Sequence, residues 1–477
     1  MTPSKRVAVI GAGPAGMTAA YQLSKEAGIN VEVFEAAPFV GGLAKSIDLW
    51  NQRVDIGPHR FFSSDKQVNS LWLEVVGSDY QMVDRLTRIL YDDNFFYYPL
   101  KPFDALSKLG FIEAARCLWS FAIQRFRKAP DTSTFEGWVT NRFGKRLFEI
   151  FFKTYSEKLW GITCDKLDAD FAAQRIKKLS LFEVVKNALH LTKKGTHKTL
   201  VDQFAYPLGG TGMVYEKMKE KVMANGGYVH LSRPVKKVLT KGNKAVGIEL
   251  ENGDTLEFDE VISSMPLTLL VERLDDVPEQ IRNKVSKLTY RNTIMVYLHV
   301  DAVDLFPDNW LYIHSQDLSF GRITNFRNWV PQLYGNENRT ILALEYWCYE
   351  EDDFWTKSDD EIIAQAQEEV RKTSLIGKAA ILDGKVIRLP RCYPVYSMGY
   401  KEHLKPVEDF LSSYESLSVI GRYGAFKYNN QDHSILMGMR AAENISKGAS
   451  NDLWDINTDY DNYQESYIIT STGLEKN

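Results

Sequence analysis

The chain has 477 residues, of which 44% are hydrophobic and 25% are charged, and its net charge is −4. This length predicts about two or three domains, and the composition is that of an ordinary globular protein. The weak negative charge argues against a nucleic-acid-binding protein, and the wide spacing of the four cysteines argues against a zinc site or a disulfide framework. No apolar stretch approaches about 18 residues, so we expect no membrane span. The widely spaced cysteines indicate no metal site and are expected to be reduced thiols, which predicts a cytoplasmic location.

The N-terminal residues carry the pattern of a dinucleotide-binding βαβ unit. A buried strand at 6–10 leads into Gly11, Gly13 and Gly16 in G-x-G-x-x-G spacing. A small-residue helix and a second strand ending at Glu35 follow. The three glycines allow a tight turn, a close approach of the backbone to a pyrophosphate, and close packing of the helix. The pyrophosphate is expected at the helix N-terminus, and Glu35 is expected to accept hydrogen bonds from an adenosine ribose.

A second glycine pair, Gly41 and Gly42, follows this unit. On these residues the chain resembles the flavoprotein superfamily that holds amine oxidases, protoporphyrinogen oxidases, phytoene desaturases and UDP-galactopyranose mutases. The resemblance implies FAD as the cofactor. It also implies an α/β fold, in which a Rossmann-like FAD-binding domain of the glutathione-reductase type carries an inserted helical domain and a substrate-facing β-sheet domain.

Local signals predict the elements that follow. Helices are expected where a cap or a glycine turn precedes helical periodicity, and strands where apolar residues run without a break. Hairpin turns are expected at 92–94 and 251–254. The expected helices cover 66–76, 214–225, 359–372 and 435–446, the expected strands cover 293–300, 310–313 and 340–347, and a long helical tract covers about 102–202.

These elements predict domains that alternate along the chain. The FAD-binding domain is expected to be built from three separate segments, because later segments with alternating strand and helix patterns complete the βαβ unit. The predicted segments are 1–87, 205–266 and 389–450 for the FAD-binding domain, 88–204 for a mainly helical substrate domain, 267–388 for a β-sheet substrate domain, and 451–477 for a loose or disordered tail.

The stretch 421–434 narrows the function most. Its dense polar side chains, between a buried strand and a helix, would destabilise the protein unless they contact a ligand. The stretch closely resembles the Gly-Arg, Tyr and Asn-Gln-Asp-His-Ser segment of UDP-galactopyranose mutases, particularly the longer eukaryotic type. Further segments with this resemblance are 57–59, 98–101, 310–312, 322–328 and 393–394.

The resemblance implies roles for individual residues. Arg322 and Arg422 would hold a substrate diphosphate, and His59 would lie beside the reactive flavin edge. Arg175, near a predicted helix start among aromatic residues, is a further candidate for contact with an anionic substrate. A structural role stays open for Arg322, Tyr393 and Arg422. The other expected substrate contacts are Tyr98, Trp310, Tyr312, Tyr393, Tyr428 and Asn430, and the expected cofactor contacts are Gly11, Gly13, Gly16, Glu35, Gly41, Gly42, His59, Val235, Gly421, Gln431, Asp432 and Ser434.

The activity implied by the resemblance is the interconversion of pyranose and furanose forms of a UDP- or other NDP-linked sugar, a step of polysaccharide biosynthesis. Reduced FAD would form an adduct between its N5 and the sugar, with no net redox change, and NAD(P)H or a redox protein would be the electron donor. Pro58 and Lys101 depart from the mutase pattern. These departures leave the movement of the His59 loop and the nucleotide base open, and a homo-oligomer is an option.

Two other readings stay open. The same N-terminal unit and the sequence around residues 160–175 are also consistent with an FAD-dependent oxidase or desaturase of the amine oxidase or protoporphyrinogen oxidase type. Against this reading, the predicted arginine and tyrosine residues suit an anionic substrate, and an apolar substrate would not require them. A flavin-binding protein without catalysis is the third reading.

Overall fold

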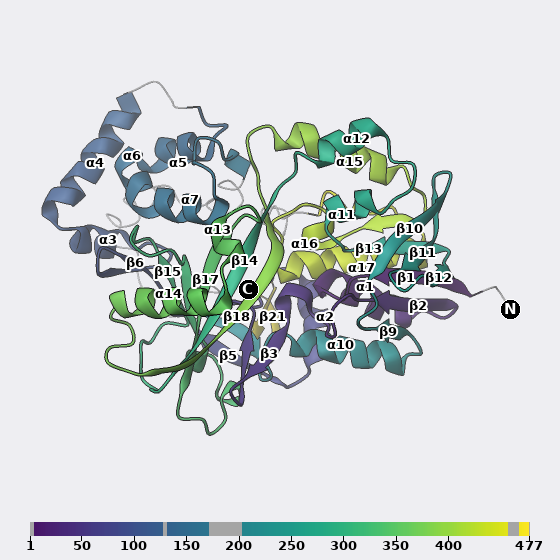
Figure 1. Ribbon diagram of the computed structural model, residues 1–477, viewed down its shortest axis with the longest axis horizontal. Helices are drawn as coiled ribbons and strands as arrows, with labels where there is room; N and C mark the ends of the chain where they lie inside the picture. The colour runs from purple at the N-terminus through teal and green to yellow at the C-terminus, as the bar shows by residue number, and fades with distance from the viewer. Residues whose placement is uncertain (1–3, 127–130, 171–202, 457–466, 477) are drawn as a thin grey trace. The chain divides into compact units, whose positions relative to one another are not determined.

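The computed structural model describes residues 4–126, 131–170, 203–456 and 467–476, and its chain divides into two compact units (Figure 1). The first unit is built from Met1–Val83, Phe204–Thr289 and Tyr400–Asn477. The second is built from Asp84–Gln203 and Tyr290–Gly399. The segments predicted as separate helical and β-sheet domains therefore lie together in the second unit, except that residues 267–289 lie in the first.

The first unit contains a five-stranded parallel sheet in the order β19-β13-β1-β2-β9. The order places β1 in the centre, and both of its neighbours hydrogen-bond to it along its buried residues. Such a sheet needs helices on its faces, because parallel strands are buried on both sides. The strands are β1 (Lys5–Ile10), β2 (Ile29–Phe34), β9 (Tyr228–His230), β13 (Glu260–Ser263) and β19 (Leu417–Val419).

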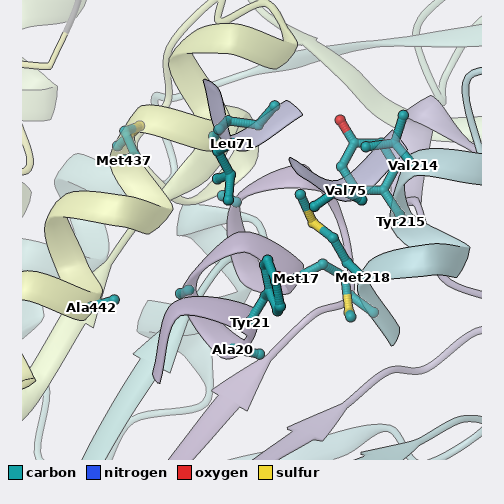
Figure 2. Packing of buried hydrophobic residues seen from close by; sticks show 14 of the residues in the cluster. Met17, Ala20, Tyr21, Leu71, Val75, Val214, Tyr215, Met218, Met437 and Ala442 are labelled. Carbon is teal, nitrogen blue, oxygen red and sulfur yellow. The ribbon is translucent and has the colours of Figure 1, made fainter. Parts of the chain in front are cut away.

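Four helices of the first unit share one hydrophobic core. Figure 2 shows Met17 and Tyr21 of α1 beside Val75 of α2 and Met218 of α10, with Met437 of α17 nearby. These side chains are buried, so the core fixes the helix that follows the first glycine turn. The helices are α1 (Pro14–Ser24), α2 (Lys66–Val76), α10 (Met213–Ala224) and α17 (Gln431–Lys447), with α11 (Leu267–Glu272), α12 (Glu279–Val285), α15 (Tyr400–Ser412) and α16 (Gly421–Gly424) elsewhere in the unit.

Smaller sheets complete the first unit. The expected hairpin at 251–254 is confirmed, because β11 and β12 pair around it and Gly253 has a φ of 90°. The short sheets are β3 (Ser46–Leu49) with β4 (Gln52–Asp55), β5 (Tyr80–Asp84) with β8 (Gln203–Pro207), and β10 (Val235–Lys241) with β11 (Lys244–Leu250) and β12 (Thr255–Glu257).

Two expectations for the first unit are wrong. Helix α17 begins at Gln431 rather than at 435, because the polar residues after the N-cap Asn430 form its first turn instead of a preceding loop. The tail is not loose over its last described residues, since β20 (Tyr467–Thr470) and β21 (Gly473–Lys476) form a hairpin. The amide of Asn69 on α2 donates to the carbonyl of Tyr467 at 3.0 Å, which ties the hairpin to that helix.

The second unit is built on a seven-stranded sheet in the order β18-β14-β17-β16-β15-β6-β7. All neighbours are antiparallel except β15 and β6. The predicted turn after β6 is confirmed, with Asp92 and Asp93 at positive φ as a two-residue hairpin requires. The strands are β6 (Thr87–Tyr91), β7 (Asn94–Tyr97), β14 (Tyr290–Val300), β15 (Trp310–Ile313), β16 (Arg322–Asn325), β17 (Thr340–Cys348) and β18 (Ile381–Pro394).

The two faces of this sheet differ in chemistry. One face is apolar and packs against α14 through side chains such as Ile323, Leu344 and Ile362. On the other face Tyr312, Arg322 and Glu345 stand opposite one another on adjacent strands. Side chains alternate between faces along each strand, so one register places an apolar core and a polar row on opposite sides.

The helices of the second unit include the predicted helix at 359–372, which is α14, and a run of helices before residue 161. No helix among the residues that the structure describes is long and apolar enough to cross a membrane. The helices are α3 (Pro102–Leu109), α4 (Phe111–Phe126), α5 (Phe135–Phe143), α6 (Lys145–Phe148), the π-helix η2 (Glu149–Lys153), α7 (Thr154–Trp160), α13 (Asp353–Thr356) and α14 (Asp359–Lys372), and the 3-10 turns are η1 (Gly42–Ala44) in the first unit and η3 (Phe326–Asn328) and η4 (Pro331–Leu333) in the second.

Candidate active site

The first glycine turn forms a cradle that requires glycine at Gly11 and Gly16. Gly11 has a φ of 95°, and Gly13 is the N-cap of α1. A Cβ at Gly16 would lie 2.0 Å from the carbonyl oxygen of Gly11, and one at Gly42 would lie 3.1 Å from the Cα of Gly13. The backbone of both glycine turns therefore lies close together at the start of α1, where unpaired N–H groups and the helix dipole favour an anion.

Glu35 ties the strand end to this cradle. Its carboxylate accepts hydrogen bonds from the backbone N–H groups of Ala12 at 2.7 Å and Ala37 at 2.8 Å. Each carboxylate oxygen has a second lone pair, so the residue can hold the turn and still accept from a ribose hydroxyl. The predicted ribose contact stays a prediction.

A buried acid organises a third glycine-rich turn, at 209–212. Asp55 accepts hydrogen bonds from the hydroxyls of Ser46 and Tyr206, both at 2.6 Å, and from the N–H of Thr211 at 3.1 Å. Burial raises the pKa of the Asp55 carboxyl to about 6, although these three donors act in the opposite direction. Asp55 thus joins strand β4 to the turn that precedes α10.

Gln431, at the first position of α17, faces this turn. Its side-chain oxygen accepts from the hydroxyl of Tyr215 at 2.7 Å and that of Thr211 at 3.3 Å. Its Nε2 is buried and has no partner in the part of the chain that the structure describes. Asp432 and Ser434, two further predicted cofactor contacts, are buried on the same helical turn. A buried amide donor without a partner calls for a ligand acceptor or water.

Arg422 and Tyr428, two predicted substrate contacts, lie against each other. The guanidinium of Arg422 stacks over the Tyr428 ring, with its Cζ 4.4 Å from the ring centroid, and its Nη1 donates to the carbonyl of Asn429 at 2.9 Å. Gly421, just before, has a φ of 83°. Asn430 is exposed at the N-cap of α17, and its N–H donates to Nδ1 of His433 at 3.2 Å.

The remaining predicted contacts of the first unit occupy two defined turns and the start of a strand. The N–H of His59 donates to the carbonyl of Gly57 at 2.9 Å, so the chain folds tightly around Pro58. Gly41 and Gly42 both have positive φ, of 102° and 55°. Val235 is buried at the start of β10, and its carbonyl accepts a hydrogen bond from the guanidinium of Arg273.

In the second unit, Arg322 is paired with an acid that the sequence did not single out. Its Nε donates to Oε1 of Glu345 at 2.6 Å, and its Nη2 donates to Oε2 of the same carboxylate. Burial lowers the pKa of Arg322, but the facing carboxylate outweighs burial and the pKa stays well above its ordinary value. The arginine is therefore charged, fixed in position and already compensated.

Aromatic side chains surround this pair on the same face. The ring of Tyr312 lies 4.9 Å from that of Tyr98 and 5.4 Å from that of Tyr155, centroid to centroid. Tyr393, from β18, packs edge-on against Trp347 at 6.3 Å. Trp310 is buried beside Trp329. The structure thus brings four predicted aromatic residues to one face of the sheet, with Tyr155 and Trp347 added.

A half-buried lysine fixes the loop that joins β15 to β16. The Nζ of Lys158 on α7 donates to the carbonyls of Ile313, Ser315 and Leu318 at 3.2, 2.9 and 2.8 Å, and lies 3.4 Å from the carbonyl oxygen of Phe320. Burial lowers the pKa of this lysine to about 8. The loop separates Tyr312 from Arg322 along the chain, so Lys158 helps to set the strands that carry both.

Sequence reasoning missed Glu345, Asp55 and Lys158. Glu345 had one signal, since it is the single charge within the apolar strand 340–348. Asp55 and Lys158 had none, because many ordinary loops and helices carry one acid or one lysine. Arg175, predicted to contact substrate, lies outside the described residues.

The residues present fit a dinucleotide cofactor, as three observations of the first unit show. The glycine cradle leaves no room for side chains at Gly16 and Gly42, α1 presents its N-terminus to it, and Gln431 offers a buried donor. With the parallel sheet, these features define a Rossmann-type dinucleotide-binding protein.

The chain belongs to the family of flavin containing amine oxidoreductases, whose profile matches residues 14–381. FAD is therefore its cofactor. The residues that would hold it are the two glycine turns, Glu35 and the first turn of α17.

The known proteins that are similar to this chain include both oxidases and mutases. Coproporphyrinogen III oxidase of Bacillus subtilis is 22% identical over 436 residues, which are 86% of this chain and 91% of that protein. A probable UDP-galactopyranose mutase of Klebsiella pneumoniae is 28% identical over 178 residues, 35% of this chain and 44% of that one. The crystal structure of a reduced UDP-galactopyranose mutase superposes with a TM-score of 0.83 at 21% identity, covering 95% of this chain and 96% of that chain, which is a likeness of fold.

Proposed function

We propose that this protein is a flavin-dependent mutase that interconverts the pyranose and furanose forms of a UDP- or other NDP-linked sugar. The observation that carries the proposal is the polar face of the seven-stranded sheet, where Arg322 is fixed by Glu345 among tyrosine and tryptophan side chains. The whole-chain fold likeness to a reduced UDP-galactopyranose mutase and the partial likeness to the Klebsiella pneumoniae protein support it.

Polar atoms on this face suit a substrate with many hydroxyl groups. Within the described ranges, several of its buried donors lack a hydrogen-bond partner, and an apolar substrate would leave each of them unsatisfied at a cost of about 1–3 kcal/mol. A sugar and its phosphates can pair with such groups. The atoms are the hydroxyls of Thr87, Thr293 and Thr324 and the indole Nε1 of Trp310 and Trp347.

Each unit also carries an arginine and tyrosine set that suits a diphosphate. In the first unit the guanidinium of Arg422 stacks on the ring of Tyr428, and guanidinium groups suit bidentate contact with phosphate. In the second unit Arg322 is held by Glu345, and Tyr393 lies on a strand of the same sheet. Tyrosine hydroxyls donate to phosphate oxygens without adding charge.

The chemistry divides between cofactor and protein. Reduced FAD supplies an electron-rich nucleophilic centre for covalent catalysis at the sugar. Arg422 would bind the departing nucleoside diphosphate. In the second unit, the aromatic side chains on the polar face of the sheet would exclude water from a substrate bound there. NAD(P)H or a redox protein would supply the electrons that keep the cofactor reduced.

The test is an anaerobic incubation of the purified protein, its flavin reduced by dithionite, with UDP-, dTDP- and GDP-hexopyranoses. Chromatography separates the ring isomers, and an oxidised sample runs alongside. We expect a new isomer only with reduced flavin. If reducible flavin is bound and no nucleotide sugar is converted, the mutase proposal fails.

A matched pair of variants tests the anion site. Arg422→Ala should weaken UDP or dTDP binding by about 3 kcal/mol, because it leaves a desolvated phosphate without its partner. Arg440→Ala is the control, since Arg440 lies on α17 and pairs with Glu443 at 2.7 Å. Flavin absorbance must be equal in both variants. Unchanged nucleotide binding by Arg422→Ala removes this role.

The second candidate is an FAD-dependent oxidase or desaturase of the amine oxidase or protoporphyrinogen oxidase type. Two observations favour it: the likeness to coproporphyrinogen III oxidase over most of both chains, and the pairing of Arg322 with Glu345, which leaves less positive charge for a diphosphate. Oxygen consumption with amines, polyenes or porphyrinogens, in the absence of nucleotide-sugar conversion, would establish this candidate instead.

A further inference from the structure

Helix α4 of the second unit carries an apolar stripe that faces solvent. Phe111 is 89% exposed, Ile112 70%, Trp119 69% and Phe126 91%. Leu118 is also exposed. Exposed aromatic residues of this size are unusual on a protein surface, and a continuous set of them marks a contact with a partner or a membrane.

The stripe is a property of the helix and not a set of isolated side chains. At about 100° per residue, the exposed apolar positions fall within an arc of about 120° that contains no polar residue. Arg116 lies at its edge, with 66% of its side chain exposed. The residues in the arc are Phe111, Ile112, Ala115, Leu118, Trp119, Ala122 and Phe126.

The opposite side of α4 is occupied by the rest of the unit. Helix α4 packs against α3, α5 and α6 (Figure 1). Cys117 is buried there, the Ser120 hydroxyl accepts from the N–H of Arg146 at 3.1 Å, and Glu113 pairs with Arg146. The helix is therefore anchored by its polar side, and its apolar side is left outward, the reverse of a helix that covers a core.

The area of the stripe argues against a second copy of this chain as its occupant. With 16 residues, α4 is about 24 Å long and about 10 Å wide, so two facing stripes would bury about 500 Å². A stable protein dimer buries at least about 1,200 Å². A lipid bilayer has no such minimum, because each inserted aromatic residue contributes separately.

Charge favours an anionic surface. Residues 101–150 contain nine Lys or Arg and five Asp or Glu, a net charge of +4, in a chain of net −4. Three exposed cations lie on α4 and on the helices that pack against it. They are Arg116 on α4, Lys101 directly before α3 and Lys145 at the start of α6. Aromatic residues in the headgroup region, flanked by cations that meet lipid phosphates, are the pattern of an interfacial helix.

We propose that the stripe of α4 docks on the surface of an anionic lipid bilayer. The helix lies in the plane of the interface, with Phe111, Trp119 and Phe126 inserted among the upper acyl chains and Arg116 among the headgroups. The protein does not span the bilayer, and it attaches to the bilayer surface reversibly, because a single short helix buries little apolar area.

Vesicle flotation of the FAD-loaded full chain tests this proposal. We expect the protein to float with vesicles of phosphatidylcholine and phosphatidylglycerol and to float less at high salt. With vesicles of phosphatidylcholine alone, it should remain in the bottom fraction of the gradient. Trp119→Ser with Phe126→Ser should lower partitioning at least about tenfold, because two inserted side chains are lost. Met223→Ser with Tyr228→Ser, which removes two other exposed apolar residues, should float like the wild type.

Flavin absorbance and the thermal midpoint show whether each variant is folded. If the double variant does not fold, Phe126→Ser at the end of α4 replaces it. The proposal is overturned if the wild type does not float with anionic vesicles, or if the stripe variant and the control float equally. It is also overturned if sedimentation velocity shows a dimer that the stripe variant abolishes while flotation is absent.

Discussion

The two units place their functional groups in different ways. In the first unit the backbone forms the cofactor cradle, since the distances from Gly16 to Gly11 and from Gly42 to Gly13 leave no room for side chains. In the second unit side chains from separate strands form the polar face, and Arg322 depends on Glu345 across a strand pair. A site made of backbone is specified by local spacing, whereas a site made of side chains is specified by register between distant segments.

The strongest way to break this comparison is a side chain in the cradle. Gly16→Val should abolish FAD binding, because even its Cβ would lie 2.0 Å from the Gly11 carbonyl oxygen. Flavin absorbance after purification measures the loss. Gly28→Ala is the control, since a Cβ there meets nothing within 4 Å and costs only about 1 kcal/mol of backbone strain. A Gly16→Val protein that retains FAD would contradict the cradle.

In the second unit the corresponding change is Glu345→Gln. It should lower the free energy of unfolding by about 4 kcal/mol, because the partly buried Arg322, 16% exposed, is left without its countercharge. Urea unfolding measures the effect. The double variant Arg322→Met with Glu345→Leu removes both charges and should recover most of the loss. If the single and double variants are equally destabilised, the pair acts by packing alone.

A third prediction tests the side-chain network within the backbone-built site. The pKa of Asp55 is about 6 in the folded protein and 3.8 in the ordinary carboxyl, so the folded state holds a proton between these values that the unfolded state releases. Asp55 therefore lowers the free energy of unfolding as pH rises from about 4 to about 6, by up to about 3 kcal/mol.

Asp55→Asn removes this titration. The difference in unfolding free energy between variant and wild type should shift in favour of the variant across that pH window, and stay constant above pH 7. Urea titrations at several pH values give the curve. Asp48→Asn, on the same hairpin and exposed, is the control and should show no such shift. A flat difference for Asp55→Asn would show that the carboxyl titrates near its ordinary value.

The smallest effect is expected on the apolar face of the sheet. Ser358 caps α14, where its hydroxyl and Glu361 satisfy each other's backbone N–H groups. Ser358→Ala should cost about 1 kcal/mol of stability and leave flavin content and nucleotide binding unchanged. Thermal unfolding measures it. A change in nucleotide binding would show that the two faces of the sheet are coupled.

The sequence alone predicted the parts that rest on local chemistry. The helices at 66–76 and 359–372 and the strand at 310–313 have the bounds expected for them. Their caps and apolar runs lie within the segment itself. The cofactor turn was predicted for the same reason, because glycine spacing alone determines it.

The rest depended on contacts that no local pattern shows. The start of α17 was placed four residues late, because polar residues at a helix start resemble a loop until their capping contacts are known. The pairing of Arg322 with Glu345 required the register of β16 and β17. Asp55 and Tyr206 are separated by 151 positions, and only the fold joins them.

The carbonyl oxygens of the loop between β15 and β16 surround the ammonium of Lys158 and accept its hydrogen bonds. The shape of the loop depends on one positive charge delivered by a helix rather than on its own sequence. Near pH 8, where about half of the Lys158 ammonium groups have lost a proton, the neutral amine has one donor fewer for the surrounding carbonyls. The order of the strand ends that carry Tyr312 and Arg322 is thereby linked to a single proton held outside both strands.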